Sequence, residues 1–497
     1  MTLEPLKLYP EQEASVQKML ENTSGGVLLG SDMGTGKTVC LVEYCIRSDA
    51  QVILIIGPLQ TMGKPIHADD EKHEGWRGTF ERQGSPLRFR QIDSSVNGKN
   101  ALADLQWGVP GLYFCGQQLF ALWGWKDVVQ RNGKKKKERT KTWDVKVDVV
   151  IYDEVHRAQS GESATSKTLM GAGRSQTGAP KAKMRIGASG TYEGNSFDGA
   201  WAVTRWLWPD LIDANQYSWR RKWAQTEYNH FAVRNEKVIG ELNPGAFVAS
   251  LPCYIRDEAD FDIEVIEETF EVDLYPDQRR VYDELEDQMV AWIKSDPLVV
   301  KYPITKRTRQ RQATLAMPTI TFNDPNDPSD IDVSFSDDCL SSKIDKTYEI
   351  LGGFFEGETA LIFTDSQKFA AVLTKRLNKH YGSPVAREWS GKVSREQRNS
   401  DKADFLDGKY CYMVCVIAAI GVGTDNLQHA ARNVLYMSSS DDRITNEQSV
   451  ARLVRDGQVS KFVRLARLIA RGTIDSGQLS KHIQDALDAN KRAKVKR

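Results

Sequence analysis

Short apolar runs alternate with helical patterns along most of the 497-residue chain. Runs rich in β-branched residues predict buried strands, and helical segments between successive strands predict parallel α/β units. The predicted strands form two groups, at residues 27–29, 52–56, 112–114, 147–152 and 184–188, and at residues 360–364, 412–418, 434–437 and 462–468. We therefore predict two parallel sheets, and so two lobes.

The segment between the two groups has the pattern of a connector. A helical pattern starts at Tyr275 and continues through Trp292, and a basic stretch over 301–311 and an acidic loop over 323–330 follow it. We predict a domain organisation with a first lobe at 1–250, a linker with a helical insertion at 251–340, a second lobe at 341–475, and a C-terminal helix with a basic tail at 476–497.

Charge and composition narrow the class of protein. The 67 basic and 67 acidic side chains cancel, which excludes a wholly basic surface but leaves room for a local basic groove. The most apolar stretch, 411–423, is shorter than the roughly 18 residues of a membrane span. The N-terminus lacks the long apolar stretch of a secretory signal, and the seven cysteines include no Cys-x-x-Cys pair. We expect a protein of a reducing compartment without a disulfide or zinc framework.

The strongest motif covers residues 30–38, between a predicted strand and a predicted helix. Its glycines let backbone amides curl around phosphate oxygens beside the helix N-terminus. Lys37 would then reach the β- and γ-phosphates of a nucleotide, and the Thr38 hydroxyl would hold Mg²⁺. The strict motif has glycine at the position of Ser31, so a glycine-rich turn before a helix is the alternative.

A second motif follows the predicted strand at 147–152 with Asp153 and Glu154. The carboxyl ends of parallel strands form the edge where such sheets bind ligands. At that edge Asp153 can hold the metal and Glu154 can polarise the attacking water. A charged cap on a strand end is the alternative for the pair alone, but the phosphate loop upstream favours a nucleoside triphosphatase.

Two arginines near the end of the second group of strands are further candidate catalytic residues. Arg452 and Arg455 lie three residues apart, a spacing that places them on one helical face. A second lobe can supply such arginines to the transition state of phosphoryl transfer. A solvated helix edge is the alternative for an isolated pair.

The order of these motifs resembles the superfamily-two helicase core, and within it the Swi/Snf-type DNA translocases. The Asp-Glu-x-His box ends at His156, and segment 8–12 matches the adenine-sensing segment of that family. The remaining matches are 189–192, a Ser-Gly-Thr-Tyr form of the coupling segment; 361–363, the strand that opens the second lobe; 389–391 with Arg398 and Phe405; 421–425, which faces DNA and nucleotide in the family; 452–458, an Arg-x-x-Arg-x-Gly-Gln segment; and 472–475, Gly-Thr-Ile-Asp. The resemblance extends over nearly the whole chain.

The resemblance implies an α/β fold of two RecA-like lobes with ATP and Mg²⁺ in the cleft between them. It implies catalytic roles for Glu154, Arg452 and Arg455, and coupling of nucleotide state through His156, Ser189 and Thr191. It assigns nucleotide binding to Gln12, Gly34, Thr35, Gly36, Lys37, Thr38, Asp153, Gly423 and Asp425, with Thr38 and Asp153 holding Mg²⁺ through the nucleotide.

The resemblance also implies an ATP-dependent helicase or translocase that moves along or remodels duplex or branched DNA in replication, recombination or repair. The compact chain favours a monomeric cytoplasmic protein of a bacterium or phage-infected cell, with replication or recombination proteins as further partners and no membrane partner. Pure duplex translocation without strand separation is one alternative. A small-molecule kinase and a nucleic-acid-binding scaffold with weak ATPase are the others, but a kinase would need neither the arginine pair nor the Gly-Thr-Ile-Asp ending.

The densest run of positive charge lies at residues 131–141 and includes Lys134, Lys135, Lys136 and Lys137. Like charges repel, so we expect a flexible and exposed loop on the first lobe. Because the whole chain is neutral, this concentrated charge predicts a contact with DNA phosphates. A solubilising insertion is the alternative.

Overall fold

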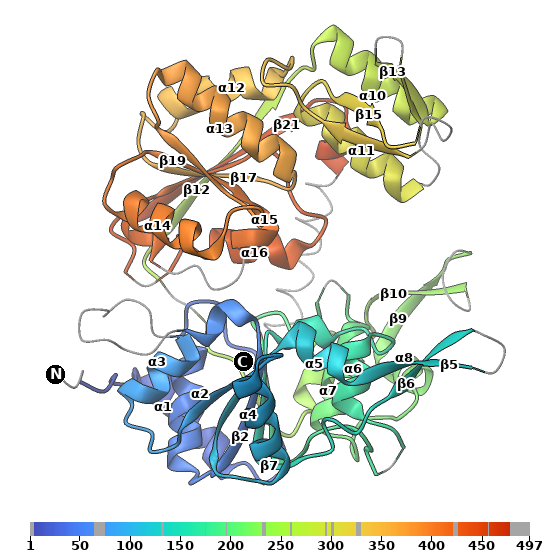
Figure 1. Cartoon of the computed structure of the whole chain (residues 1–497), viewed down its shortest axis with the longest axis vertical. Helices are drawn as coiled ribbons and strands as arrows, with labels where there is room; N and C mark the ends of the chain where they lie inside the picture. Colours follow the sequence, from blue (N-terminus) through green and yellow to red (C-terminus); the bar gives the residue numbers. More distant parts are fainter. Residues whose placement is uncertain are drawn as a thin grey trace. The chain divides into compact units, whose positions relative to one another are not determined.

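The computed structural model describes residues 4–63, 75–130, 134–173, 175–194, 196–230, 235–258, 261–293, 296–299, 303–324, 330–420, 426–455 and 457–477. The chain divides between residues 260 and 261 into two compact units. Each unit contains one large parallel sheet with helices packed against it (Figure 1). No helix in the described ranges is long and apolar enough to cross a membrane.

The first unit contains a seven-stranded parallel sheet in the order β11-β1-β8-β7-β2-β4-β3. Its strands are β1 Gly26–Leu29, β2 Val52–Gly57, β3 Phe89–Ile92, β4 Gly111–Gly116, β7 Lys146–Asp153, β8 Lys181–Ala188 and β11 Tyr254–Ile255. Its helices are α1 Pro10–Glu21, α2 Lys37–Arg47, α3 Gly75–Arg82, α4 Val96–Gln106, α5 Gln117–Trp123, α6 Ala164–Met170, α7 Gly199–Leu207, α8 Gln216–Trp223 and α9 Ala246–Ala249, with the 3₁₀ turns η1 Leu59–Met62 and η2 Val155–Ala158. Two antiparallel hairpins pair β5 Trp125–Val129 with β6 Lys135–Arg139, and β9 Ala224–Tyr228 with β10 Glu236–Glu241.

The second unit contains a six-stranded parallel sheet in the order β12-β21-β20-β17-β19-β18. Its strands are β12 Glu264–Val272, β17 Ala360–Thr364, β18 Ala386–Trp389, β19 Tyr412–Val416, β20 Asn433–Tyr436 and β21 Phe462–Ala470. Its helices are α12 Ser342–Gly352, α13 Gln367–Tyr381, α14 Arg395–Leu406, α15 Ile417–Ile420 and α16 Arg443–Val450, with the 3₁₀ turn η4 Leu427–His429. A side layer contains α10 Pro276–Gln288, α11 Pro303–Leu315 and the hairpins β13 Val290–Ile293 with β14 Asp296–Val299 and β15 Thr319–Phe322 with β16 Ile331–Ser334.

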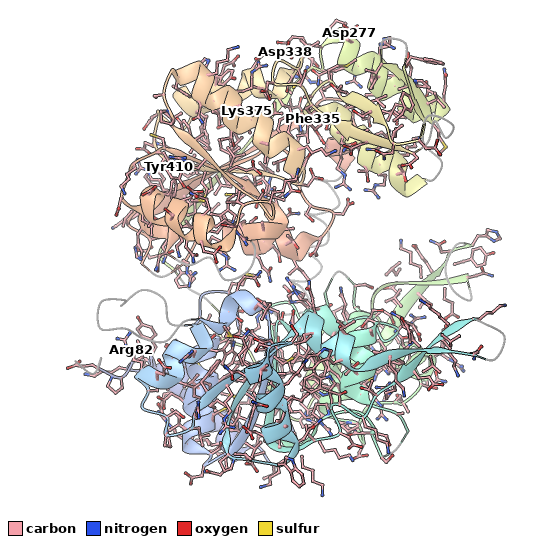
Figure 2. All side chains as sticks on the ribbon, in the orientation of Figure 1. Arg82, Asp277, Phe335, Asp338, Lys375 and Tyr410 are labelled. Carbon is pink, nitrogen blue, oxygen red and sulfur yellow. The ribbon has the colours of Figure 1, made fainter. Side chains whose placement is uncertain are left out.

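The central strands are apolar throughout because both faces of each sheet are covered. In β17, Ile362 packs in the cluster that contains Leu373 of α13, whereas Leu361 and Phe363 pack in the cluster that contains Phe405 of α14. Side chains fill the space between sheet and helices in both units (Figure 2). A strand buried on both faces has no polar side, which is why its sequence is a continuous apolar run.

The predicted fold class, two parallel-sheet α/β lobes, is confirmed. All nine predicted strands are present, and each lies in the interior of its sheet. The prediction lacks the four edge strands β3, β11, β12 and β18. The segment predicted as linker and insertion, 251–340, supplies β11 to the first sheet and β12 to the second, and its basic stretch lies largely in helix α11. The predicted helix and basic tail beyond residue 477 lie outside the described residues.

Candidate active site

The phosphate loop connects β1 to α2 and requires glycine at two positions. Gly34 has a φ of 83° and Gly36 a φ of 79°, a backbone conformation that side chains with a Cβ rarely adopt. A Cβ on Gly36 would also lie 2.4 Å from the Gln12 side-chain nitrogen. The loop therefore reverses direction tightly and leads directly into the N-terminus of α2, where backbone amides can meet an anion.

Gln12 connects the adenine-sensing segment to the phosphate loop. Its side-chain nitrogen donates to the carbonyl oxygen of Thr35 at 2.8 Å, and its side-chain oxygen accepts from the backbone amide of Tyr9 at 2.9 Å. The structure thus brings the predicted residues Gln12, Thr35 and Gly36 together. Their predicted contact with a nucleotide base stays a prediction.

Lys37 is the first residue of α2 and is half-buried in the phosphate loop. Its ammonium donates to the carbonyl oxygens of Ser31 at 2.9 Å and of Asp32 at 2.8 Å. Burial lowers the pKa of Lys37, and the negative charges of Glu154 and Asp153 oppose that shift. Lys37 and the two carboxylates therefore belong to one electrostatic site.

The loop has a hydrogen-bonded support that the sequence analysis did not identify. The buried Ser31 hydroxyl donates to the Asp257 carboxylate at 2.9 Å, and the Ser15 hydroxyl donates to the same carboxylate at 2.8 Å. The Asp257 carbonyl accepts from the backbone amide of Asp32 at 2.9 Å. Arg256 lies 3.3 Å from the Asp32 carboxylate. Serine in place of the usual glycine is thus explained, because its hydroxyl connects the loop to the segment after β11.

Asp153 ends β7 at the carboxyl edge of the sheet and is held by hydrogen bonds. Its Oδ2 accepts from Trp76 Nε1 at 3.1 Å and from the Thr61 hydroxyl at 3.3 Å, and its backbone carbonyl accepts from the Gln117 side chain at 2.7 Å. Burial, together with the neighbouring charge of Glu154, raises the pKa of Asp153 to about 6. Carboxylate and hydroxyl oxygens are the ligands that Mg²⁺ takes in proteins, so Asp153 and Thr38, in the first turn of α2, suit that ion chemically.

Asp153→Asn should stabilise the metal-free protein at alkaline pH. A carboxyl whose pKa is raised by folding stabilises the fold below its ordinary pKa near 3.8, and this contribution is lost as the pH rises through about 6. The asparagine carries no charge to bury, so the variant should gain about 2 kcal/mol over the wild type at pH 8 and lose that advantage near pH 4. Thermal unfolding at both pH values measures the difference.

Asp148→Asn is a control of opposite sign for that experiment. Although burial opposes it, hydrogen bonds from Lys183, Val52 and Gln51 lower the pKa of Asp148. This carboxylate therefore stabilises the fold above its ordinary pKa and loses the contribution as the pH falls. Its asparagine variant should be destabilised most at neutral pH. If the stabilities of the two variants relative to the wild type change with pH in the same direction, the conclusion that the environment of Asp153 disfavours its charged form is wrong.

Glu154 has a strained backbone at the start of η2. Its φ of 53° is uncommon for a residue with a Cβ, and such strain is concentrated at functional sites. Its Oε2 lies 3.3 Å from Nδ1 of the buried His156. The same His156 nitrogen lies 2.9 Å from the Ser189 hydroxyl, which accepts from the backbone amide of Thr191 at 3.1 Å. The structure thus connects Glu154 to all three predicted coupling residues.

The second unit holds the predicted arginines, but not on a helix. Helix α16 ends at Val450, and Arg452 and Arg455 lie in the tight turns that follow, so the predicted shared helical face is wrong. The buried Leu453 fills the core between them, and Gln458 donates to its carbonyl at 3.0 Å. The chain turns here because Leu453 packs inward and Gly457 adopts a φ of 80°. The predicted nucleotide residues Gly423 and Asp425 lie outside the described residues.

The Gly-Thr-Ile-Asp segment contains a buried ion pair. Asp475 lies 2.8 Å from the ammonium of the fully buried Lys343 on α12, and it accepts from the backbone amide of Ala470 at 3.0 Å. Lys343 also donates to the carbonyl of Met437 at 2.6 Å. This segment therefore connects the end of β21 to α12 and to the end of β20, which is a structural role within the second unit.

Asp475→Ala should destabilise the second unit strongly. The substitution leaves the Lys343 ammonium buried without its carboxylate, which typically costs about 3–5 kcal/mol. Chemical unfolding of the full chain measures the loss. The double variant Lys343→Met with Asp475→Leu removes both charges and should recover much of the stability. If Asp475→Ala unfolds at the wild-type denaturant concentration, the buried pair is not a stabilising feature.

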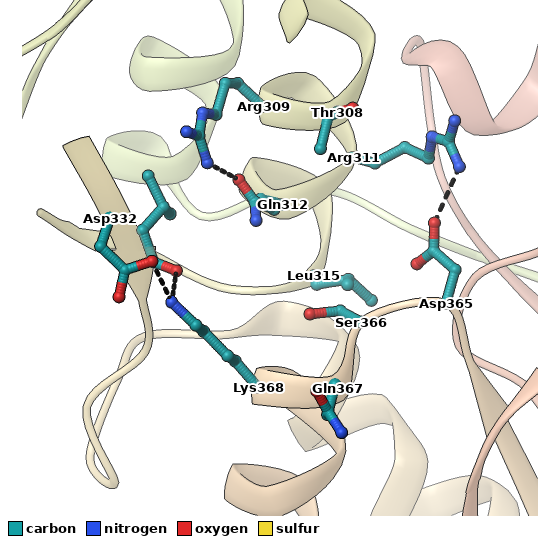
Figure 3. Close-up of a pocket in the computed structure, with 11 residues that line it drawn as sticks. Thr308, Arg309, Arg311, Gln312, Leu315, Asp332, Asp365, Ser366, Gln367 and Lys368 are labelled. Atoms are coloured by element: carbon teal, nitrogen blue, oxygen red, sulfur yellow. Dashed lines mark hydrogen bonds and ion pairs between the residues drawn. The ribbon is translucent and has the colours of Figure 1, made fainter. Parts of the chain in front are cut away.

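A cavity of about 370 Å³ lies in the second unit between α11, β16 and the start of α13 (Figure 3). Arg311 pairs with Asp365 at 2.8 Å, and Lys368 pairs with Asp332. Arg309 instead donates to the Gln312 side chain at 2.9 Å, and no carboxylate of the described residues pairs with it. Burial lowers the pKa of Arg309. The cavity therefore keeps one positive charge that an incoming anion could neutralise.

The lysine run forms a strand, and the prediction of a flexible loop is wrong for its described part. Residues 135–139 form β6, which pairs with β5 so that Lys137 lies opposite Asp127 and Glu138 opposite Lys126. These two oppositely charged neighbours offset only part of the repulsion within the run, because Lys135 and Lys136 lie opposite valines. Lys134 to Lys137 are exposed, as predicted, and residues 131–133 lie outside the described part.

A phosphate loop and an Asp-Glu box at the carboxyl edge of one parallel sheet are the features of a P-loop nucleotide-binding protein. Comparison with known proteins agrees with that class. Over 136 residues the chain is 28% identical to "Putative ATP-dependent helicase/translocase YwqA" of Bacillus subtilis (strain 168). The matched segment is 27% of this chain and 14% of that protein. The similarity to a protein with that name agrees with the helicase or translocase resemblance that the motifs predict.

The chain was also compared with models of protein families and with solved structures. No family model matches the chain. Among solved structures, the Sulfolobus solfataricus SWI2/SNF2 ATPase core in complex with dsDNA matches 100% of this chain and 97% of its own, at 17% identity and a TM-score of 0.40. At that TM-score the structural likeness adds nothing to the inference, which depends on the motifs and their geometry.

Proposed function

We propose that this chain is an ATP-dependent DNA translocase of the Swi/Snf type. The observation that carries the proposal is the convergence of Lys37 with Asp153 and Glu154 at one sheet edge, with Glu154 connected through His156 to Ser189. A phosphate-binding cation, a metal-binding carboxylate and a water-orienting carboxylate are the groups that phosphoryl transfer to water requires. ATP is the proposed cofactor, with Mg²⁺ held by Thr38 and Asp153.

Each of these residues has a separate proposed role in ATP hydrolysis. The phosphate loop and Lys37 hold the phosphates, and Mg²⁺ supplies charge neutralisation on the phosphate oxygens. Glu154 orients the attacking water, and its carboxylate lies 3.3 Å from Nδ1 of His156. Arg452 and Arg455 stabilise the charge that develops in the transition state. His156 and Ser189 change partners with nucleotide state and pass that change to the segment at 189–192.

DNA is the proposed track, and two described surfaces suit its backbone. The exposed lysines of β6 lie on the first unit, and Arg309, which forms no ion pair with a described carboxylate, lines the cavity of the second. Guanidinium and ammonium groups of this kind bind phosphodiesters. The finer proposal is action on duplex or branched DNA in replication, recombination or repair.

Steady-state ATPase assays test the proposal. Turnover should be low without nucleic acid, rise with duplex, forked or four-way DNA more than with single strands, and vanish when EDTA removes Mg²⁺. A strand-displacement assay on the same forks then separates translocation from unwinding. A chain that binds ATP but hydrolyses none under any of these conditions would overturn the enzymatic proposal.

A further inference from the structure

The β5–β6 hairpin is a strongly positive ribbon on the first unit. Its described residues, 125–130 and 134–139, carry six cations and two anions. Among the described strands the hairpin pairs only within itself, and it extends away from the helices that flank it (Figure 1). A two-stranded ribbon has the width that the major groove of B-DNA admits.

The hairpin lysines are available to an external anion. Lys126, Lys135, Lys136 and Lys137 are exposed, and none of them forms an ion pair with any residue of the described ranges. The facing anions Asp127 and Glu138 lie on the opposite strands of the ladder from Lys137 and Lys126. The ribbon therefore presents charge that its own fold leaves largely unneutralised.

The base of the hairpin is hydrogen-bonded to α6. Trp125 Nε1 lies 3.1 Å from the Thr168 hydroxyl and 3.3 Å from the Ala164 carbonyl. The Arg139 guanidinium lies 4.8 Å from the centroid of the Trp125 ring and donates to the Lys167 carbonyl at 2.5 Å. A movement of the ribbon would therefore act on α6.

The packing at this base is also close. A Cβ on Gly124, the residue before β5, would lie 2.4 Å from the Thr168 hydroxyl. Only glycine lets the backbone approach α6 at this distance without displacing it. The hairpin base and α6 are thus packed against one another as well as hydrogen-bonded.

Helix α6 in turn contacts the catalytic segment. The buried Ser166 hydroxyl donates at 2.5 Å to the carbonyl of Ala158, the last residue of η2. The turn η2 starts directly after Glu154 and includes His156. One hydrogen bond therefore connects the helix that holds the hairpin to the turn that orients the catalytic carboxylate.

Helix α5 provides a second connection. It ends at Trp123, two residues before β5, and its first residue, Gln117, donates to the Asp153 carbonyl at 2.7 Å. Both strands of the hairpin base are thus connected, through α5 or α6, to the segment that carries Asp153 and Glu154. Hydrogen bonds of this kind can couple the position of the hairpin to the position of the catalytic carboxylates when each element moves as a unit.

We propose that the β5–β6 hairpin is a DNA-sensing element whose binding to the phosphodiester backbone raises ATP turnover through α5 and α6. The inference rests on the proposed function and adds to it the element that reports DNA to the catalytic carboxylates. The hairpin lysines provide affinity, and the Trp125 base provides the connection.

Two variants separate these roles. Replacing Lys135, Lys136 and Lys137 with serine removes three of the six described cations and keeps the base, whereas Trp125→Phe removes the indole donor and keeps every cation. A control for charge removal elsewhere on the same unit replaces two exposed lysines, Lys99 on α4 and Lys146 on β7, with serine. Duplex affinity over a range of salt, ATPase without DNA, and ATPase at saturating duplex are measured for each.

The lysine variant should bind duplex DNA about tenfold more weakly at moderate salt. The slope of log affinity against log salt should fall by about 0.9 for each phosphate that the variant no longer neutralises. Trp125→Phe should keep wild-type affinity, salt slope and DNA-free ATPase, but lose most of the stimulation at saturating DNA. Thermal unfolding near the wild-type temperature shows that the variant is folded.

Full stimulation of Trp125→Phe at saturating DNA would overturn the proposed coupling. A wild-type salt slope in the lysine variant would overturn the proposed binding of the hairpin to DNA. Absence of any DNA stimulation in the wild type would instead contradict the proposed function itself, so the two failures are distinguishable.

Discussion

Glu154→Gln is expected to reduce ATP turnover to background, a loss of about 10³-fold, while ATP and DNA binding persist. The amide keeps the shape of the side chain but removes the charge that orients the attacking water. The hydrogen bonds of the phosphate loop are untouched, because Lys37 donates to loop carbonyls and not to Glu154. Steady-state ATPase and equilibrium binding of a fluorescent nucleotide measure the two properties separately.

Lys37→Ala is the informative contrast, because it should weaken nucleotide binding as well as turnover. Glu162→Gln provides a matched control on the same unit, since the side chain of Glu162 is 89% exposed and pairs only with Lys167 among the described residues. That variant should keep the wild-type rate. Near-normal turnover in Glu154→Gln would remove Glu154 from the catalytic group.

Arg452→Ala and Arg455→Ala should each lower DNA-stimulated turnover by about 10³-fold with little change in ATP affinity. Cations that meet charge developed only in the transition state act on the rate and not on ground-state binding. The turn that carries both residues is held by the buried Leu453 and by Gln458, so each alanine variant should stay folded. Turnover with and without duplex DNA, compared with nucleotide affinity, measures the effect.

Arg387→Ala is the control for this experiment, because Arg387 is an exposed arginine on the edge strand β18 of the same unit. Its rate should equal that of the wild type. If both Arg452→Ala and Arg455→Ala also keep that rate, the proposal that these arginines act in the transition state is wrong.

The positions of Ser31 and Asp257 show how the chain departs from the usual phosphate loop without losing its geometry. The hydroxyl of Ser31 satisfies a carboxylate that also accepts from Ser15 of α1. Two other segments, α1 and the residues after β11, therefore support one loop. A motif search compares residues one position at a time and cannot detect such a partner, because Asp257 lies 226 residues away.

The sequence by itself determined the interior of both sheets and the order of the site motifs. Strands buried on both faces must be apolar at every position, and this constraint is visible without a structure. The edge strands were not predictable in the same way. In β12 most side chains are exposed, and Glu267 pairs with Arg467 of β21 and Glu271 with Arg471 just after β21, so the run contains no continuous apolar signal.

Only the tertiary structure decided which distant residues act together. The contact of Glu154 with His156 follows from their spacing, but the approach of Ser189 depends on the parallel pairing of β7 with β8. The lysine run became a strand because it pairs with β5, in which Asp127 lies opposite Lys137. Helix α16 ends before Arg452 and Arg455, because the chain turns there to bury Leu453. Pairing and burial are long-range interactions, and a local pattern specifies neither.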